Sequence, residues 1–353
     1  MLSIIGRFFS IPSKFALALT FFCSLPSPVC SSEPHEMKTG ATLGSILRHT
    51  TEADDVLADD ARMEILADGF DFSEGPVWMP EGELLLFSDI PRNTIYQWRD
   101  ATGLQVFLRP SGYTEVTPRG GEPGANGLLR DLDGRLILME HGDRRVTRLD
   151  DPRRAIKTVL ADRFEGKRLN SPNDGVMKSN GDLYFTDPPY GLEGQDTDPA
   201  KELDFQGVYL LTVDGQLKLL TRDLNRPNGI GLSPDERTLY VANSDPDRAL
   251  WMAYNVRPDG TLAGGRVFQD RTTALKNGKQ GLPDGMTIDS TGLIYATGPG
   301  GVLIFTPTGK HIATLATGGE TGNCVFGGDG SDLYITAHQY LVKIRLKTKG
   351  LGY

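Results

Sequence analysis

Six residues with side-chain oxygens recur along this 353-residue chain, each at the start of a similar segment. Every one is an Asn, Asp or Glu directly ahead of an apolar run, and successive positions are 52, 47, 55, 56 and 39 residues apart. If the segments stand around an axis, these positions predict a ring of side-chain oxygens around one opening of a central channel. The six residues are Glu74, Asn126, Asn173, Asn228, Asp284 and Asn323.

Turn formation is the alternative explanation for these residues. Asn and Asp before Gly tolerate left-handed backbone and hydrogen-bond to their own main chain, so a turn accounts equally well for any single position. It does not account for Glu74, because Glu is a poor turn former. The set as a whole therefore favours the ring.

The segments that must position this ring are predicted to be β-strands. After each of the six residues comes an apolar strand, then a turn rich in Gly, Asp, Asn or Ser, then a second strand such as ELLLFSDI, DLYFTDPP or TLYVANSD. Residues 62–346 contain no helix-length pattern with a period of 3.6 residues. Repeats of this length are typical of four-stranded blades, so we expect an all-β, six-bladed β-propeller.

The predicted propeller occupies residues 62–353, and residues 63–66 could supply the outer strand of its last blade. Residues 1–31 contain an apolar stretch, FALALTFFCSL, that follows basic residues and is too short to span a bilayer. They are predicted to be a secretory signal peptide of a periplasmic or secreted protein, with an uncleaved membrane anchor as the alternative. Residues 32–61 are polar and predict a tether, with a short helix near residues 43–48.

Charge and cysteine content limit the possible partners and chemistry. The formal net charge of −9 argues against nucleic acid as a partner. One cysteine, Cys324, falls within the predicted propeller, where a small buried side chain is a better explanation than a nucleophile. No internal disulfide is expected, and no Cys/His spacing typical of zinc sites is present.

Four segments taken together resemble one protein family. They are SEGPVW, RLNSPNDGV with DLYFTDPPYG, RPNGIGLSPDERTLYVANSD and LPDGMTID, in this order and at blade spacing. Over about residues 62–346 the chain is similar to the gluconolactonase, senescence-marker-protein and luciferin-regenerating-enzyme family, and most like bacterial gluconolactonases. The resemblance implies a six-bladed propeller with one divalent metal ion, usually calcium, at the mouth of the axial channel.

The resemblance also implies that four of the six recurring residues hold this metal ion. All four have hard oxygen donors, which select Ca²⁺, Mg²⁺ or Mn²⁺ over zinc. Two of them are carboxylates, whose charges would neutralise the ion. The four residues are Glu74, Asn173, Asn228 and Asp284.

Such a site suits hydrolysis of a small-molecule sugar lactone of the glucono-1,5 type. A metal ion that accepts the lactone carbonyl oxygen stabilises the negative charge developing there. Asp284 is the general base that the resemblance implies. A metal-bound hydroxide is the alternative attacking species, because a metal-bound carboxylate is a weak base.

Two other functional classes stay open at this point. The first is another metal-dependent hydrolase on the same scaffold, acting on other aldonolactones or on phosphotriesters. The second is a non-catalytic propeller that binds proteins or glycans. The four candidate ligands count against this second class, because a scaffold alone does not need them.

Three further residues, all of the second blade, are candidates for substrate binding. Asn126 occupies the ring position of that blade and could hydrogen-bond sugar hydroxyls, and Glu140 and His141 end one of its strands. An ordinary polar residue at a blade corner is an equally good explanation of His141. Asp174 is expected to orient Asn173 or to cap a turn.

Three more positions affect the expected site. Animal members of the family have an Arg two residues before the motif Asn, where this chain has Ser171, so the substrate contact of that Arg is missing here. Tyr190 lies in the extended segment TDPPYGLEGQDTDPAKELDF, which could be a lid or an ordinary surface insertion. His338 could be structural or belong to the site.

Overall fold

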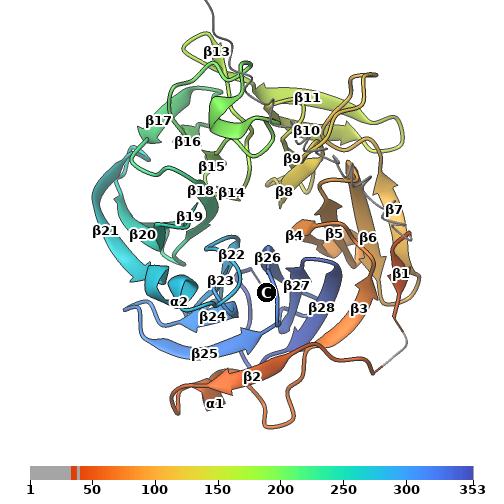
Figure 1. Cartoon of the computed structure of the whole chain (residues 1–353), viewed down its shortest axis with the longest axis vertical. Coiled ribbons are helices and arrows are strands. Elements are labelled where there is room, and N and C mark those ends of the chain that lie inside the picture. The colour runs from red at the N-terminus through yellow and green to blue at the C-terminus, as the bar shows by residue number, and fades with distance from the viewer. Residues whose placement is uncertain (1–32, 38–39, 353) are drawn as a thin grey trace, which may run out of the picture. The chain divides into compact units, whose positions relative to one another are not determined.

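The computed structural model describes residues 33–37 and 40–352. These residues form six sheets around a central axis, so the predicted six-bladed β-propeller is confirmed (Figure 1). The innermost strand of each sheet contacts the innermost strand of the next, and the sixth contacts the first, which closes the ring. These innermost strands, in blade order, are β4 (Ser73–Met79), β8 (Ala125–Arg130), β14 (Gly175–Met177), β18 (Pro227–Leu232), β22 (Met286–Ile288) and β26 (Asn323–Gly327).

Each blade continues outward through three further antiparallel strands. The second strands of the first three blades are buried along their whole length, because neighbouring blades cover both of their faces. The outer strands of the first three blades are β5 (Leu84–Asp89), β6 (Thr94–Arg99) and β7 (Gly103–Leu108); β9 (Leu136–Glu140), β10 (Arg145–Asp151) and β11 (Ile156–Ala161); β15 (Leu183–Asp187), β16 (Gly207–Leu211) and β17 (Leu217–Thr221). Those of the last three blades are β19 (Thr238–Asp245), β20 (Arg248–Val256) and β21 (Leu262–Asp270); β23 (Ile294–Gly298), β24 (Gly301–Phe305) and β25 (His311–Ala316); β27 (Asp332–Ala337), β28 (Tyr340–Arg345) and β3 (Glu64–Asp68).

The last blade is completed by a strand from near the start of the described chain. β3 pairs antiparallel with β28, as predicted for residues 63–66. This pairing joins the two ends of the propeller and covers a sheet edge that would otherwise be open. The predicted signal peptide, residues 1–31, lies outside the described residues.

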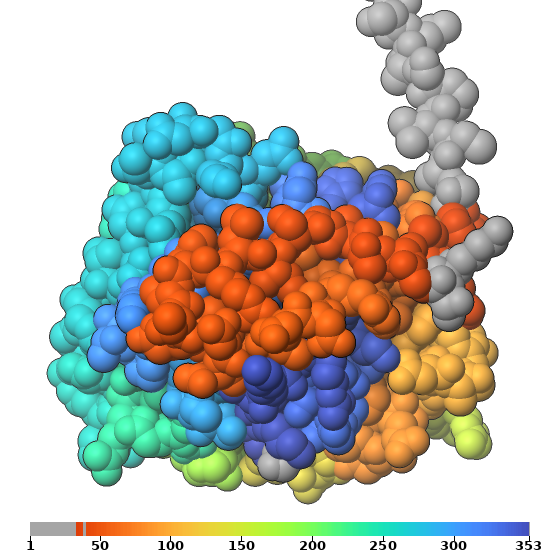
Figure 2. Space-filling model, turned by 90° about the horizontal axis from the view of Figure 1, so that it is seen from below, coloured from red at the N-terminus to blue at the C-terminus, as the bar shows by residue number. Residues whose placement is uncertain are grey.

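Residues 33–61 differ from the predicted polar tether with a helix near residues 43–48. At that position β2 (Ser45–Arg48) pairs with β25 as the fifth strand of blade 5, and β1 (His35–Glu36) pairs with β3. The short helix α1 (Ala53–Val56) follows β2 and buries its apolar residues against the last two blades. Figure 2 shows this N-terminal segment lying across the C-terminal strands. Covering the edge of β25 and burying these apolar side chains explain why the segment packs on the propeller.

Short elements lie in the connections between strands. No helix in residues 33–37 and 40–352 is long and apolar enough to cross a bilayer. The remaining elements are the hairpin of β12 (Arg163–Phe164) and β13 (Lys167–Arg168), the helix α2 (Thr272–Lys276) and the 3₁₀ turns η1 (Pro80–Gly82) and η2 (Gln195–Thr197).

Neighbouring blades are joined by apolar clusters and, near the channel, by hydroxyl groups. The apolar clusters combine side chains from the facing sheets of adjacent blades. Ser88 Oγ of β5 donates to the main-chain oxygen of Asn126 at 2.8 Å, and Thr186 Oγ1 of β15 donates to that of Asn228 at 2.8 Å. These contacts fix the main chain of the recurring residues relative to the preceding blade.

Candidate metal centre and active site

One end of the central channel opens into a cavity of about 1160 Å³. Five of the six recurring residues line it, each at or just before the start of an innermost strand. The structure therefore brings together all four candidate metal ligands and the candidate substrate residue of the second blade. The five residues are Glu74, Asn126, Asn173, Asn228 and Asp284.

Three of these residues lie inside strands, so the turn explanation is wrong for them. Glu74, Asn126 and Asn228 are the second residues of β4, β8 and β18. In each strand the pairing with the neighbouring strand shifts register at or directly after this position. An extra residue in a strand bends it locally and re-aims the side chains beside it. We infer that this irregularity turns the three side chains toward the cavity.

Glycine follows most of the recurring residues because the blades approach closely around the channel. A Cβ atom on Gly75 would lie 2.0 Å from the main-chain oxygen of Asn126, and one on Gly229 would lie 2.1 Å from that of Asp284. Neither distance is possible for a real side chain, so only glycine fits. The Glu-Gly and Asn-Gly pairs in the sequence therefore reflect packing between blades.

Glu74 and Asp284 place two carboxylates on the same cavity. Burial raises the pKa of Glu74 to about 8, and the charge of Asp174 adds to this while the Gly75 N–H opposes it. Burial also raises the pKa of Asp284 well above its usual value, and the negative charges of Glu74 and Asp174 raise it further. Carboxylates that are poorly solvated and repel one another favour a cation between them. A divalent cation at this site would relieve both effects.

Asn173 and Asn228 both have their amide nitrogens in contact with neighbouring side chains. Asn228 Nδ2 donates to Ser244 Oγ at 3.0 Å, and Ser244 Oγ donates to the main-chain oxygen of Pro283 at 2.5 Å. Asn173 Nδ2 lies 3.3 Å from His141 Nε2. In both residues Oδ1 is thus the end of the amide that remains available to a ligand in the cavity.

Two carboxylates and two amide oxygens on one cavity fit Ca²⁺, Mg²⁺ or Mn²⁺ better than zinc. No group of three or more His, Cys, Asp or Glu side chains in the described part of the chain is placed to hold a metal ion. A cation in this cavity would therefore depend on Asn173 and Asn228 as well as on the two carboxylates. The donor types are those of the predicted ligand set.

Asn323 departs from the predicted ring, because its amide lies deeper in the channel. Asn323 Nδ2 is 3.4 Å from Asp174 Oδ2, and both residues line a second cavity of about 370 Å³. Asn323 also donates to the Glu74 carboxylate, and Asp174 Oδ1 accepts from the Gly175 N–H at 2.8 Å. Asn323 therefore supports the candidate ligand Glu74, and Asp174 contacts Asn323 and the Gly175 N–H rather than Asn173.

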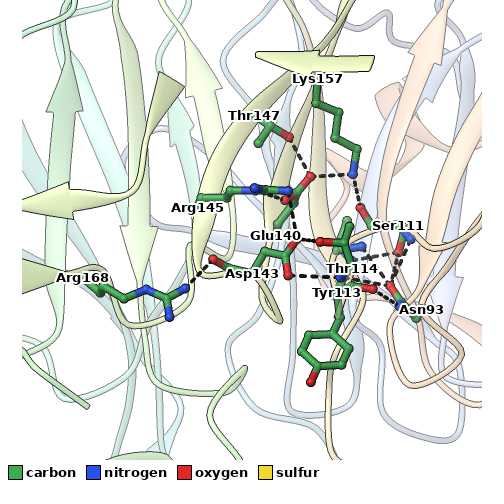
Figure 3. Close-up of polar contacts among 12 residues, drawn as sticks. Asn93, Ser111, Tyr113, Thr114, Glu140, Asp143, Arg145, Thr147, Lys157 and Arg168 are labelled. Atoms are coloured by element: carbon green, nitrogen blue, oxygen red, sulfur yellow. Dashed lines mark hydrogen bonds and ion pairs between the residues drawn. The ribbon is translucent and has the colours of Figure 1, made fainter. Parts of the chain in front are cut away.

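Glu140, a predicted substrate-binding residue, does not line the cavity; it takes part in the network of polar contacts shown in Figure 3. Its carboxylate is fully buried within blade 2, where Oε1 accepts from Lys157 Nζ at 2.6 Å and from Thr147 Oγ1 at 2.8 Å. Oε2 accepts from Arg145 Nε at 2.5 Å. With both oxygens used in these contacts, the role of Glu140 is structural.

Glu140→Ala is expected to lower the free energy of unfolding by about 3–5 kcal/mol, because it leaves Lys157 buried without its counter-charge. The side chain of Lys157 is only 8% exposed. Urea denaturation of the variant beside the parent measures the loss. The matched control is Asp329→Ala, which removes an exposed carboxylate paired with the exposed Arg345 and should change stability little. Equal stability of Glu140→Ala and its parent would contradict the structural role.

The histidines and the cysteine named from the sequence lie outside the ring. His141 is fully buried behind Asn173, and its Nδ1 is 3.2 Å from Glu122 Oε2, so it contacts a candidate ligand rather than the open cavity. His338 is exposed at the rim of the cavity. Cys324 is 2% exposed and unpaired, as predicted.

Glu122 is a cavity residue that the sequence did not reveal. It lies in the loop PRGGEPGA, which has no strand periodicity, and its carboxylate adds to the rise in the pKa of both Glu74 and Asp284. A single acidic residue in a Gly- and Pro-rich loop gives no pattern that would single it out.

The segment with Tyr190 forms part of the cavity wall. Ser171 holds this segment, since its hydroxyl donates to the main-chain oxygen of Pro188 at 2.5 Å and accepts from the Gly191 N–H at 2.9 Å. The guanidinium of Arg226 lies 5.5 Å from the centre of the Tyr190 ring. Ser171, which stands where animal members of the family have an Arg, therefore holds the segment that contains Tyr190.

The fold and the site define a six-bladed propeller with carboxylate and amide oxygens around one end of its channel. The family described as SMP-30/Gluconolactonase/LRE-like region matches residues 72–339. The chain belongs to this family, and the predicted resemblance is confirmed.

Individual relatives agree with this assignment. The chain is 39% identical over 316 residues to the gluconolactonase of Zymomonas mobilis, with 88% of each protein covered. It is 32% identical to a gluconolactonase of known structure from Xanthomonas campestris, with a TM-score of 0.75 and coverage of 86% of this chain and 96% of the other. Regucalcin of Oryctolagus cuniculus is 28% identical over 280 residues, which cover 77% of this chain and 85% of that protein.

Proposed function

We propose that the protein is a metal-dependent hydrolase that opens sugar-acid lactones of the glucono-1,5 type. One observation carries this proposal: the four candidate ligands from four different blades line one cavity, in a chain that belongs to the gluconolactonase family. The relatives named gluconolactonase support the lactone as substrate. A cavity of about 1160 Å³ has room for a hexose lactone beside an ion.

Glu74, Asn173, Asn228 and Asp284 would hold one divalent cation, with Ca²⁺ preferred and Mg²⁺ or Mn²⁺ as alternatives. When bound, such a cation stabilises the negative charge that develops on the lactone carbonyl oxygen. The amide nitrogens of Asn173 and Asn228 contact neighbouring groups, which would leave their oxygens available to hold the ion.

The two carboxylates have different surroundings, and this difference favours Asp284 over Glu74 as the group that takes the proton. Glu74 is 2% exposed and accepts hydrogen bonds from the Gly75 N–H and from Asn323, so it is enclosed. Asp284 remains partly exposed to the cavity. Asp284 would take the proton of the attacking water while the new bond forms at the carbonyl carbon, and it would return this proton to the ring oxygen as the ring C–O bond breaks.

Asn126 is the candidate for substrate contact in this proposal. It lines the same cavity from blade 2, and only its main-chain oxygen is used by Ser88. Its amide could therefore hydrogen-bond a sugar hydroxyl.

Metal removal tests this function directly. The purified protein is expected to release acid from glucono-1,5-lactone, to lose this activity after exhaustive chelation and to regain it with Ca²⁺, Mn²⁺ or Mg²⁺. A panel of other aldonolactones and one phosphotriester, assayed in the same way, identifies the preferred substrate. Lactone hydrolysis that is unchanged by chelation would contradict metal dependence, and absence of hydrolysis of every substrate would favour a binding propeller.

We also propose that the protein is exported, on the basis of the apolar segment and small residues within residues 1–31. Mass spectrometry of the N-terminus of protein from the native cell should find a chain that starts near residues 30–33. An intact N-terminus on protein recovered from the cytoplasm would contradict export.

A further inference from the structure

Three side chains form a chain of contacts that ends at one of the candidate metal ligands. Glu122 Oε2 lies 3.2 Å from His141 Nδ1, and His141 Nε2 lies 3.3 Å from Asn173 Nδ2. The His141 side chain is completely buried, whereas Glu122 and Asn173 both line the cavity. His141 thus stands between a carboxylate and the amide of a candidate ligand.

The chemistry of the Asn173 contact determines which nitrogen of His141 has the proton. The Asn amide nitrogen carries two hydrogens and can only donate, so His141 Nε2 must be the acceptor. The proton of the neutral imidazole then lies on Nδ1, which faces the Glu122 carboxylate. The contact between Nδ1 and Glu122 has the distance of a hydrogen bond but not its alignment, and no other acceptor in the described residues serves Nδ1 better.

The position of His141 is held from both sides. Glu140, the residue before it, is fixed in blade 2 by its contacts with Lys157, Thr147 and Arg145. On the other side the main chain of Gly191 packs so closely that a Cβ there would lie 2.6 Å from His141 Cβ. The main chain and Cβ of His141 are thus held on both sides.

We propose that His141 is a positioning residue that sets the orientation of the Asn173 amide. By accepting from Nδ2, His141 leaves Oδ1 as the atom that Asn173 presents to the cation in the cavity. An amide turned the other way would direct an NH₂ group at the cation, which would remove one ligand. This inference rests on the proposed metal site, and it parallels the role of Ser244 at Asn228.

Calorimetric titration with Ca²⁺ tests this role without any activity assay. His141→Leu removes the acceptor at similar volume and is expected to weaken Ca²⁺ binding about tenfold to a hundredfold, the usual effect of losing a group that orients a ligand. His141→Gln retains an oxygen acceptor, so its affinity should stay close to that of the parent. In an Asn173→Ala background, His141→Leu should cause no additional loss, because its effect passes through Asn173.

The outcomes separate this inference from the proposed function. If the parent binds none of Ca²⁺, Mg²⁺ and Mn²⁺, the proposed metal site fails. If the parent binds Ca²⁺ and His141→Leu binds it equally well, or if the loss is the same with and without Asn173, the positioning role is wrong. Circular dichroism of each variant confirms that the propeller is folded.

Nitrogen-15 NMR of the histidine rings gives a second test that needs only the folded parent. The chain has five histidines, and His141→Gln identifies the signal of His141 by its disappearance. The inference predicts the neutral tautomer with the proton on Nδ1. A proton on Nε2 would overturn it, whether or not His141→Leu folds.

Discussion

Asp284→Asn is expected to reduce turnover by about 10²–10⁴-fold and to weaken metal binding at the same time. The substitution keeps the size of the side chain but removes a negative charge that the cation needs and the group proposed to take the proton from water. Asp284 contacts Asn228 and lies in the field of Glu74, so the new amide should fit without disturbing the blades.

Asn126→Ala is the matched control for Asp284→Asn, because both residues line the same cavity. We expect it to lower kcat/KM by the equivalent of one hydrogen bond, about 0.5–1.5 kcal/mol, while metal affinity stays near that of the parent. Steady-state kinetics and calorimetric metal titration of both variants provide the comparison. Full activity of Asp284→Asn, or loss of the metal in Asn126→Ala, would contradict the assigned roles.

Gly322→Ala is expected to weaken metal binding strongly although Gly322 contributes no ligand. A Cβ at this position would lie 2.4 Å from Glu74 Oε1 and 3.0 Å from the main-chain oxygen of Ser73. The carboxylate of Glu74 must therefore move, and a metal ligand displaced in this way should reduce affinity by about tenfold or more. Activity should fall in parallel, since both depend on the same ion.

Gly319→Ala is the control for this second prediction. It lies in the same connection, and nothing approaches within 4 Å of the position that its Cβ would take. Calorimetric titration should find parent-like metal affinity in Gly319→Ala and reduced affinity in Gly322→Ala. Equal metal affinities in the two variants would mean that the Glu74 carboxylate is not held beside Gly322 as a metal ligand.

The spacing of the recurring residues was sufficient to predict the fold, because one such residue marks each blade and the strands between them have clear apolar patterns. The same residues predicted most of the cavity. Asn323 is the exception: its side chain turns toward Asp174 and away from the larger cavity. The sequence shows where a strand begins but not the local direction of a side chain at an irregular strand start.

Glu140 and His141 show a second limit of the sequence. Glu140 is the last residue of β9 and His141 follows the strand, so the two side chains have different surroundings although they are adjacent in the sequence. The residue types alone do not show whether either of the two reaches the cavity. Only the partners of Glu140, which come from β10 and β11, show that Glu140 is the structural residue.

Residues 32–61 and Glu122 could not be predicted for a different reason. The pairing of β2 with β25 joins positions more than 250 residues apart, and the short apolar stretches near α1 are separated by charged residues that suggest a tether. Glu122 reaches the cavity only because its loop folds over the end of the channel. The pairing of β2 and the position of Glu122 both depend on tertiary contacts rather than on a local sequence pattern.

The most direct test of the metal site is anomalous diffraction from crystals grown with Mn²⁺ or Ca²⁺. The account predicts one ion in the larger cavity, bound by side-chain oxygens of all four candidate residues at distances of about 2.3–2.6 Å for Ca²⁺. These residues are Glu74, Asn173, Asn228 and Asp284. An ion bound elsewhere in the protein, with this cavity holding only water at saturating metal concentration, would contradict the account.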